Sequence, residues 1–381
     1  MLKVIEYIKS HKNWEDDLAQ SPYCISVSKD NMYGRNLALL KYNQISSDFN
    51  NEIVRECRGL IIDIDSLEPV SVPFYKFGNY GESYCPEIDW KSAKITQKID
   101  GSLIKIVRLG NDLLISTNGT IDASKAEVAQ NLDFKYSNYK ELIENAEPLK
   151  SISKDKWLDL FEENYTYMFE LISPYNKVVI PYEGINLCLI GVRNNKSLEE
   201  ILIYDHPLAK IFKTPKQYGF KSLDECILAA NELPYTEEGY VVVDKNFNRV
   251  KVKSPSYVAV HHLKGQGILT PKKAMILIVN NEIDEFLNYF SEYKLNIQRM
   301  LDGYHSLINA IDDEYNSNID YINSLESRKD KAQYILKNCK FSNYMFKAID
   351  NKYDCAMQYI SDLTYDKLAD MVEDFIKNAW H

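Results

Sequence analysis

Short segments in which apolar and polar residues alternate fill the first two thirds of the chain. Their β-branched residues and their spacing are typical of strands in antiparallel sheets. The predicted strands cover residues 58–65, 98–109, 112–119, 167–173, 186–193, 238–244 and 249–254. Gly110 and Asn111 separate two of them and predict a hairpin turn, because both residues tolerate positive φ. Lys98 is therefore expected at the start of the first arm of a hairpin.

Beyond residue 270 the period of the apolar residues changes to that of helices. Thr270 and Pro271 form a helix start, with an N-cap followed by proline at the first helical position. Apolar residues then recur at helical spacing over 286–311, and further helices are predicted at 328–339, 341–350 and 364–379. We interpret the apolar stripe as packing rather than a seam for a partner. The pattern predicts an α+β fold, with an antiparallel-sheet domain over 1–265 and an all-helical domain over 266–381.

Composition and charge narrow the choice of function. The 381 residues are 45% hydrophobic and 26% charged, which is typical of a soluble globular protein. A net charge of −10 argues against a large nonspecific duplex-binding surface, but less against an enzyme that acts on a strand end. Seven scattered cysteines predict reduced thiols. The longest apolar run, residues 274–279, is too short to span a bilayer, so we expect a soluble, cytoplasmic protein without a membrane partner.

Several lysines and carboxylates occupy predicted strands, where solvated charges are not expected. They are Lys98, Asp100, Glu170, Glu238, Lys251 and Lys253. Taken singly, each can be the polar side of a half-exposed strand. Strand alternation, however, places Lys98 and Asp100 on one face, and Lys251 and Lys253 on one face of another strand. Together the six residues suggest a site for a polyphosphate and a divalent metal.

The chemistry open to this set is specific. A lysine amine is a nucleophile only when deprotonated, and the cations Lys251 and Lys253 favour that neutral form of Lys98. The same two cations can stabilise charge that develops on phosphorus. Carboxylates are suitable ligands for Mg²⁺, which also binds phosphate oxygens. Asp100, Glu170 and Glu238 are the candidate metal ligands, and the implied reaction is attack of Lys98 on a nucleotide α-phosphorus.

These residues belong to an ordered series of motifs. "KIDGS" (98–102) resembles motif I of the covalent nucleotidyltransferases, the superfamily of ATP-dependent ligases and capping guanylyltransferases. "STNG", "FELISPYNKVVI", "LIGVRN", "EEGYVVV" and "VKVKS" resemble the motifs that follow it. Upstream, "RECRGLIIDID" (55–65) and "PFYKFGNYGE" (73–82) resemble the N-terminal signature of the RNA ligase 1 family, the bacteriophage tRNA-repair kind. The helical region after the last motif is also similar to that family.

The resemblance implies a role for each residue. Lys98 would carry AMP, and Asp100 and Glu238 would organise a metal and its waters. Glu170 would hold the ribose or a metal-bound water, while Lys251 and Lys253 would contact the α-phosphate. Arg58 and Lys76 would contact the outer phosphates of ATP or the RNA end, and Gln97 would present backbone atoms to adenine. Two departures from the family are Ser116 and Asn118, which stand where basic residues are common, and "KFGN" in place of "KFFN".

The activity implied by the resemblance is ATP-dependent RNA ligation in three steps. Lys98 takes AMP from ATP, the AMP moves to a 5′-phosphate of RNA, and a 3′-hydroxyl then displaces it. ATP and Mg²⁺, or Mn²⁺ in its place, would be the cofactors. The partner would be RNA with 5′-phosphate and 3′-hydroxyl ends, tRNA among them, and the enzyme is expected to be a monomer. The helical domain is a candidate for RNA recognition.

Two other functions remain open from the sequence. One is a related nucleotidyltransferase that uses GTP or acts on DNA ends, and the other is a nucleotide- or RNA-binding module without ligation activity. The segment 209–222 carries Lys210, Lys213, Lys216 and Lys221 with aromatic residues between them. It is either a solvated surface loop or a contact for an RNA backbone.

Overall fold

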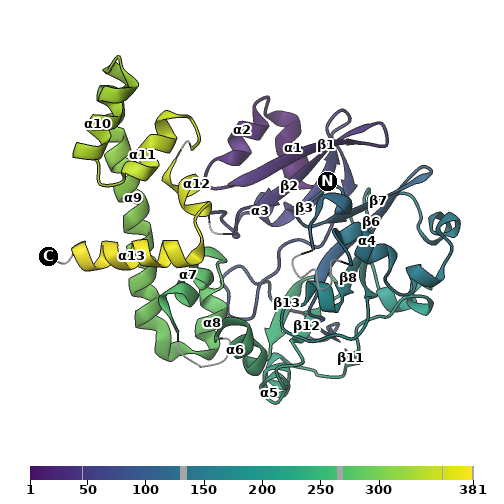
Figure 1. Cartoon of the computed structure of the whole chain (residues 1–381). Helices are drawn as coiled ribbons and strands as arrows, with labels where there is room; N and C mark the ends of the chain where they lie inside the picture. Colours follow the sequence, from purple (N-terminus) through teal and green to yellow (C-terminus); the bar gives the residue numbers. More distant parts are fainter. Residues whose placement is uncertain (45, 129–134, 264–268, 354, 380–381) are drawn as a thin grey trace. The chain divides into compact units, whose positions relative to one another are not determined.

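The computed structural model describes the whole chain except residues 45, 129–134, 264–268, 354 and 380–381. The chain divides into two units, Met1–Gly265 and Gln266–His381. The described residues of the first unit form three antiparallel sheets with short helices, and those of the second form helices (Figure 1).

The first sheet is an antiparallel meander in the order β1-β2-β3-β4. Its strands are β1 (Ile25–Met32), β2 (Arg35–Tyr42), β3 (Arg58–Asp63) and β4 (Glu68–Ser71). Helices α1 (Lys3–Ser10), α2 (Trp14–Ala19) and α3 (Glu52–Glu56) accompany it. Ile5 and Leu18 of α1 and α2 pack against Leu40 and Ile62 of the sheet, so these helices cover one of its faces.

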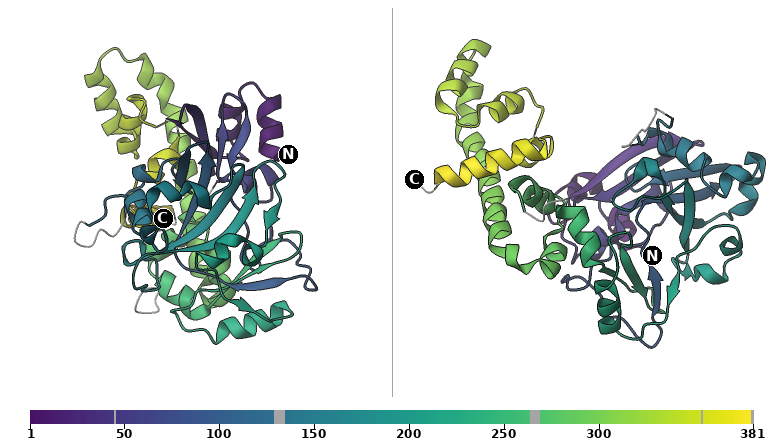
Figure 2. Two further views of the ribbon diagram at one scale, coloured as in Figure 1. Left: turned by 90° about the vertical axis from the view of Figure 1, so that its right-hand side faces the viewer. Right: turned by 60° about the horizontal axis from the view of Figure 1, so that its bottom comes forward.

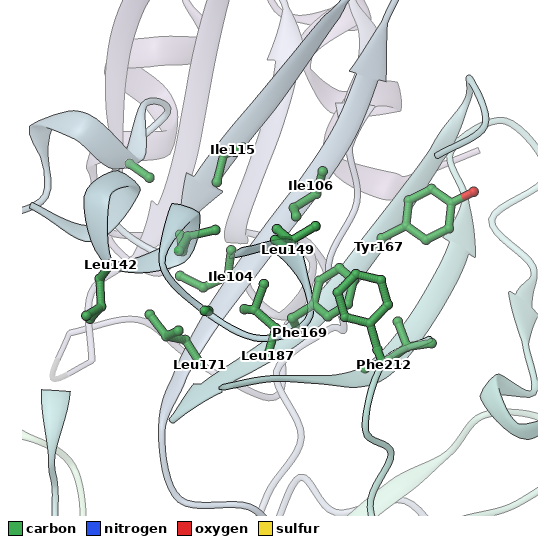
Figure 3. Close-up of a cluster of buried hydrophobic side chains, with 14 of the residues drawn as sticks. Ile104, Ile106, Ile115, Leu142, Leu149, Tyr167, Phe169, Leu171, Leu187 and Phe212 are labelled. Atoms are coloured by element: carbon green, nitrogen blue, oxygen red, sulfur yellow. The ribbon is translucent and has the colours of Figure 1, made fainter. Parts of the chain in front are cut away.

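The second sheet has the order β10-β9-β8-β6-β7. Its strands are β6 (Ser102–Leu109), β7 (Asp112–Thr117), β8 (Tyr165–Ile172), β9 (Asn186–Asn194) and β10 (Glu200–Ile201). Ile104, Phe169 and Leu171 point into a core with Leu142 of α4 (Tyr139–Glu144) (Figure 3). The opposite face packs on the first sheet, where Val107 meets residues of β2, β3 and β4.

The third sheet, in the order β11-β5-β12-β13, completes the first unit. Its strands are β5 (Lys94–Gln97), β11 (Gln217–Tyr218), β12 (Gly239–Val243) and β13 (Arg249–Lys253). Helix α5 (Leu223–Asn231) packs on one face, where Cys226 meets Tyr240 and Val252. Helix α6 (Pro255–Leu263) follows β13. The residues of β12 and β13 that alternate with those under α5 point to the opposite face of the sheet.

The strand predicted over 98–109 begins only at Ser102, so that prediction is wrong at its first four residues. Lys98–Gly101 instead link β5 of the third sheet to β6 of the second. Gly101 explains the path of the chain, because a Cβ at this position would lie 2.4 Å from the Leu171 carbonyl oxygen. The predicted hairpin is confirmed, with Gly110 at φ +62° between the antiparallel strands β6 and β7.

The second unit contains seven helices in its described residues. They are α7 (Pro271–Val279), α8 (Ile283–Tyr289), α9 (Lys294–Ser324), α10 (Arg328–Asn338), α11 (Ser342–Ile349), α12 (Ala356–Ser361) and α13 (Tyr365–Ala379). The Thr270 hydroxyl caps α7, as predicted, by accepting from the Lys273 backbone N–H. Helix α13 crosses α9 (Figure 2). At Gly303 a Cβ would lie 2.5 Å from Ile376, so this glycine permits close packing of α9 on α13.

The α+β fold class and the change from sheets to helices along the chain are thus confirmed. One predicted stripe differs: the apolar residues over 286–311 belong to α8 and α9, which a short 3₁₀ turn at Ser291–Tyr293 separates. Among the residues that the structure describes, no helix combines the length and apolar character needed to cross a bilayer.

Candidate active site

A cavity of about 320 Å³ opens between the second and third sheets. Glu170 of β8 contributes to one wall, and Thr96, Val241 and Lys251 of β5, β12 and β13 contribute to the other. Lys98 lies in the wall where the link between β5 and β6 passes. Strand alternation accounts for the arrangement, because the residues that lie between these in β12 and β13 pack under α5.

Lys98 is held in an ion pair beside the cavity. Its Nζ lies 2.6 Å from Glu238 Oε1, and Lys253 Nζ lies 3.5 Å from the same oxygen. The Glu238 side chain is only 4% exposed, and Oε2, its second oxygen, is buried without a hydrogen-bond partner. The sequence predicted cations next to Lys98. The structure shows in addition that the Glu238 carboxylate lies between Lys98 and Lys253. The Lys98–Glu238 pair must therefore break, with transfer of a proton, before the nitrogen can act as a nucleophile.

Glu170 faces the same cavity from β8. The surrounding protein desolvates its carboxyl and raises its pKa to about 7, an effect that nearby Lys98 opposes. A carboxyl with such a pKa changes charge near neutral pH. It can accept a hydrogen bond or bind a cation when ionised, and it can donate a hydrogen bond when protonated.

Asp100 is buried behind the cavity wall and has its own hydrogen-bond partners. Its Oδ2 accepts from the backbone N–H groups of Val179 and Ile180 at 3.0 and 2.9 Å. Its Oδ1 accepts from the Tyr257 hydroxyl at 2.9 Å. The expectation that Asp100 and Lys98 share the face of a strand is wrong, because neither residue lies in a strand. Asp100 ties the link between the sheets to residues 179–180 and α6, and its metal role stays a prediction.

Arg58 and Lys251 meet at one aromatic ring. The Arg58 guanidinium and the Lys251 ammonium lie 5.5 and 5.3 Å from the centroid of the Phe77 ring, and all three residues line the cavity. One guanidinium nitrogen of Arg58, Nη1, is buried without a hydrogen-bond partner. A buried unpaired donor is costly, so this nitrogen is suited to an anionic ligand.

Lys76 lies outside this constellation, and Gln97 lies within it. The Lys76 ammonium is 4.8 Å from the centroid of the Phe49 ring and 5.6 Å from that of Tyr42, and Lys76 does not line the cavity. Gln97 does line it, and its backbone N–H already donates to the Lys216 carbonyl at 2.8 Å. The structure therefore brings Arg58, Gln97, Lys98, Glu170 and Lys251 to one cavity. Glu238 and Lys253 join them through ion pairs.

The segment 209–222 is partly built into the walls of the site. The Lys213 carbonyl accepts from the Leu189 N–H in β9, and β11 pairs with β5. The side chains of Lys210, Lys213, Lys216 and Lys221 are all exposed. Their backbone is thus anchored to two sheets, while their charges are available at the surface.

The sequence did not predict a buried trio of charges that also reaches the cavity. Both carboxylate oxygens of Glu200 accept from the Arg249 guanidinium, and one also accepts from Arg193. Glu200 and Arg249 line the cavity, whereas Arg193 lies behind them. Arg193 and Glu200 are close in the chain, but Arg249 is far from both, so no local pattern could predict this contact.

Two carboxylates of the site fit a divalent metal. The unpaired Oε2 of Glu238 and the desolvated carboxyl of Glu170 are hard oxygen donors beside a cavity with cationic walls. Mg²⁺ typically binds one or two carboxylates together with phosphate oxygens and water. Among the described residues, no group of three or more His, Cys, Asp and Glu side chains gathers around a single point. Mg²⁺ held by these two carboxylates would complete its ligands with phosphate oxygens and water.

Comparison with known proteins identifies the class of protein that this fold and site belong to. A family model described as "RNA ligase" matches residues 56–257, which include all the motifs above except Arg55 at the start of the first. This match spans more than half of the chain. The chain belongs to the RNA ligase family.

Two relatives and one solved structure illustrate the range of similarity. The "RNA ligase" of Rhodothermus phage RM378 is 26% identical over 377 residues, which covers 82% of this chain and 83% of the phage protein. The "Putative bifunctional polynucleotide kinase/RNA ligase" of Autographa californica nuclear polyhedrosis virus is 31% identical over 302 residues, which is 74% of this chain but only 42% of the viral protein. An "Archaeal ATP-dependent RNA ligase" has a TM-score of 0.47 and 12% identity, and covers 75% of this chain and 74% of its own.

Proposed function

We propose that the protein is an ATP-dependent RNA ligase that works through a covalent bond between Lys98 and AMP. The observation that carries the proposal is the position of Lys98 at a cavity with cationic walls, in a chain of the RNA ligase family. Its ion pair with Glu238 supports the role, because the carboxylate is within reach to accept the proton that the attacking nitrogen loses.

Each step is an in-line displacement at phosphorus. In the first, the Lys98 nitrogen attacks the α-phosphorus of ATP, the bond to the bridging oxygen breaks, and pyrophosphate leaves. In the second, an oxygen of the RNA 5′-phosphate attacks the same phosphorus and releases the lysine. In the third, the 3′-hydroxyl attacks the activated RNA phosphate and expels AMP. The site contributes positioning and charge neutralisation, which supply most of the catalysis in such reactions.

The residues of the cavity divide the work between charge and position. Lys251 and Lys253 would stabilise the charge on the α-phosphate, and Arg58 would bind the outer phosphates. Glu170 and Glu238 would hold Mg²⁺ or Mn²⁺, whose chemistry is to neutralise phosphate charge. Asp100, proposed with them from the sequence, would act mainly by holding the Lys98 link in place, since its oxygens already accept three hydrogen bonds.

Radioactive nucleotide labelling tests this proposal. Incubation with α-³²P-ATP and a divalent metal should leave label on the protein that resists denaturation, and α-³²P-GTP should not. Label from GTP alone would replace the ATP assignment by the related transferase. The absence of covalent label from either nucleotide would favour the binding module without ligation activity.

The exposed lysines of segment 209–222 are proposed contacts for the RNA backbone. Replacing Lys210, Lys213, Lys216 and Lys221 by glutamine should weaken RNA joining by about tenfold or more at moderate salt, because phosphate contacts dominate such affinities. It should also flatten the dependence of joining on salt, yet leave lysine adenylylation intact. Joining is measured with a nicked tRNA stem-loop and with an unstructured oligonucleotide that carries the same ends.

Comparing the nicked tRNA stem-loop with the unstructured oligonucleotide also tests the proposed role in tRNA repair. We expect faster joining of the stem-loop, and equal rates would count against a dedicated tRNA substrate. Equal loss of joining and of adenylylation in the lysine variant would contradict a role in RNA binding. A matched double variant, Lys329→Gln with Lys337→Gln, removes two exposed charges from α10. Its joining rate tests whether the helical unit also contacts RNA.

A further inference from the structure

A fully buried lysine lies in the layer between the first and second sheets. Alternation along β6 puts Leu103, Lys105 and Val107 on the face that packs on the first sheet. Lys105 is 0% exposed, and its neighbours across the strands are Ser116 and Met168. Lysine is almost never fully buried unless it is paired. Its presence in an apolar layer therefore requires an explanation.

The contacts of Lys105 are those of a cation without a counter-charge. Its Nζ donates to the Gly59 carbonyl in β3. In the part of the chain that the structure describes, no carboxylate lies within ion-pair distance of it. Burial, and then the charge of Arg58, lower its pKa to about 7. The side chain thus loses or gains a proton near neutral pH, unlike a solvated lysine.

Two more cations lie next to Gly59 in the first sheet, where Lys41 of β2 is the cross-strand partner of Arg58 of β3. Arg58 precedes Gly59 in the chain and faces the cavity, with its Nη1 buried and unpaired. A Cβ on Gly59 would lie 2.8 Å from the carbonyl oxygen of Asn118, a residue that also lines the cavity. The Lys41 ammonium lies 3.6 Å from the position of a Cβ on Gly119. Neither Lys41 nor Arg58 forms an ion pair among the described residues.

We propose that Lys105 is a positioning residue for the outer phosphates of the bound nucleotide, an inference that rests on the proposed function. Its hydrogen bond to the Gly59 carbonyl orients the adjoining Arg58 toward the cavity. The Lys41 ammonium and the Arg58 guanidinium make this end of the cavity suited to a polyanion, and Lys105 adds a third positive charge when it is protonated. When the phosphates bind beside Arg58, the amine of Lys105 takes a proton from solvent and becomes an ammonium.

The charged groups around Lys105 set the direction of this change. Arg58 from β3 disfavours the ammonium, and β7 and β8 contribute the uncharged Ser116 and Met168 opposite Lys105. Glu170 lies further along β8, and the charge of Arg58 lowers its pKa, although the two side chains form no ion pair among the described residues. An added polyanion opposes the field of Arg58, so it raises the pKa of Lys105. Because Glu170 also titrates near neutral pH, the proton belonging to Lys105 must be isolated by comparison with a variant.

Calorimetry with α,β-methylene-ATP and Mg²⁺ measures both affinity and proton uptake, because this analogue cannot transfer AMP. The wild-type protein and Lys105→Met are compared at pH 8 in buffers with different ionisation enthalpies. Methionine keeps the length of the side chain and fills the apolar layer. We expect the wild type to take up more protons than the variant, by up to one per nucleotide. At pH 8, a rise of one unit in the Lys105 pKa from about 7 strengthens binding by about twofold, and a rise of two units by about tenfold. The variant should therefore bind about two- to tenfold more weakly.

Controls separate this role from a merely structural one. Ser116→Ala alters the residue opposite Lys105, and Lys125→Met removes an exposed lysine that pairs with Asp30; both should bind the analogue like the wild type. Lys105→Gln keeps a donor for the Gly59 carbonyl but cannot titrate, so it should lose the extra proton uptake even if Lys105→Met does not fold.

Unchanged affinity and proton uptake in either Lys105 variant would overturn the inference. A wild-type protein that neither binds the analogue nor becomes labelled by ATP would instead refute the proposed function, which is a separate outcome.

Discussion

Lys98→Ala should abolish the covalent labelling of the protein by α-³²P-ATP, with a loss of about a thousandfold or more in rate. The expected size follows from the loss of the nucleophile itself, since effects of this class are among the largest seen in enzyme variants. The measurement is the rate of label incorporation under single-turnover conditions. Because Lys98 forms an ion pair with Glu238, its removal also leaves that carboxylate with Lys253 as its cationic partner among the described residues.

Two controls show whether the loss is chemical. Lys245→Ala removes an exposed lysine from the loop between β12 and β13 and should label at the wild-type rate. RNA that already carries AMP on its 5′-phosphate should still be joined by Lys98→Ala, because the third step does not use the lysine. Undiminished labelling of Lys98→Ala would remove Lys98 from its assigned role.

Glu200→Gln should lower the free energy of unfolding by about 3–5 kcal/mol. Glu200 is 2% exposed, and the guanidinium groups of Arg193 and Arg249 are 5% and 11% exposed. Removing the carboxylate charge leaves two buried cations without their counter-ion. Their other contacts, such as the hydrogen bond from Arg193 to the Pro73 carbonyl at 2.7 Å, cannot replace it. Urea denaturation gives the change directly.

An exposed ion pair provides the matched comparison. Glu15 lies 2.6 Å from Lys29, and both side chains are more than two fifths exposed. Glu15→Gln should therefore cost at most about 1 kcal/mol, as is usual for surface pairs. Similar losses in the two variants would mean that burial does not decide the strength of the Glu200 contacts. Because Glu200 also lines the cavity, nucleotide binding is measured alongside stability.

Local patterns predicted the strands that carry the motifs, together with the change to helices. Enrichment in β-branched residues, or alternation of apolar and polar ones, marks a strand, so β3, β7, β8, β9, β12 and β13 were predicted nearly to their bounds. The start of β6 was not, because "KIDG" alternates like a strand although the chain there passes between two sheets. Asp100 makes the difference: its hydrogen bonds to residues 179–180 are contacts that no local window contains.

In the candidate site, too, the sequence predicted which residues take part but not all of their contacts. Charged residues within apolar strands were recognisable, and the cavity brings five of the predicted set together. The partner of Lys98 was predicted as a metal organiser rather than as an ion pair, because the meeting of residues 98 and 238 depends on the pairing of β5 with β12. The sequence does show that Lys105 interrupts the apolar strand "SLIKIVRL". Its proposed role, however, follows only from its position beside Gly59 and Arg58, which the sequence does not show.

Hydrogen bonds hold the link between β5 and β6 at Lys98 itself and at Asp100. The Lys98 N–H donates to the Gly239 carbonyl in the third sheet, and Asp100 is bonded to residues 179–180 and to Tyr257. A nucleotide attached to Lys98 would consequently be tethered to a fixed point, with only the four-carbon stem of the side chain free to move. In such an arrangement the adenylate cannot be carried to a distant acceptor. The RNA end must instead travel to the cavity and fit its opening.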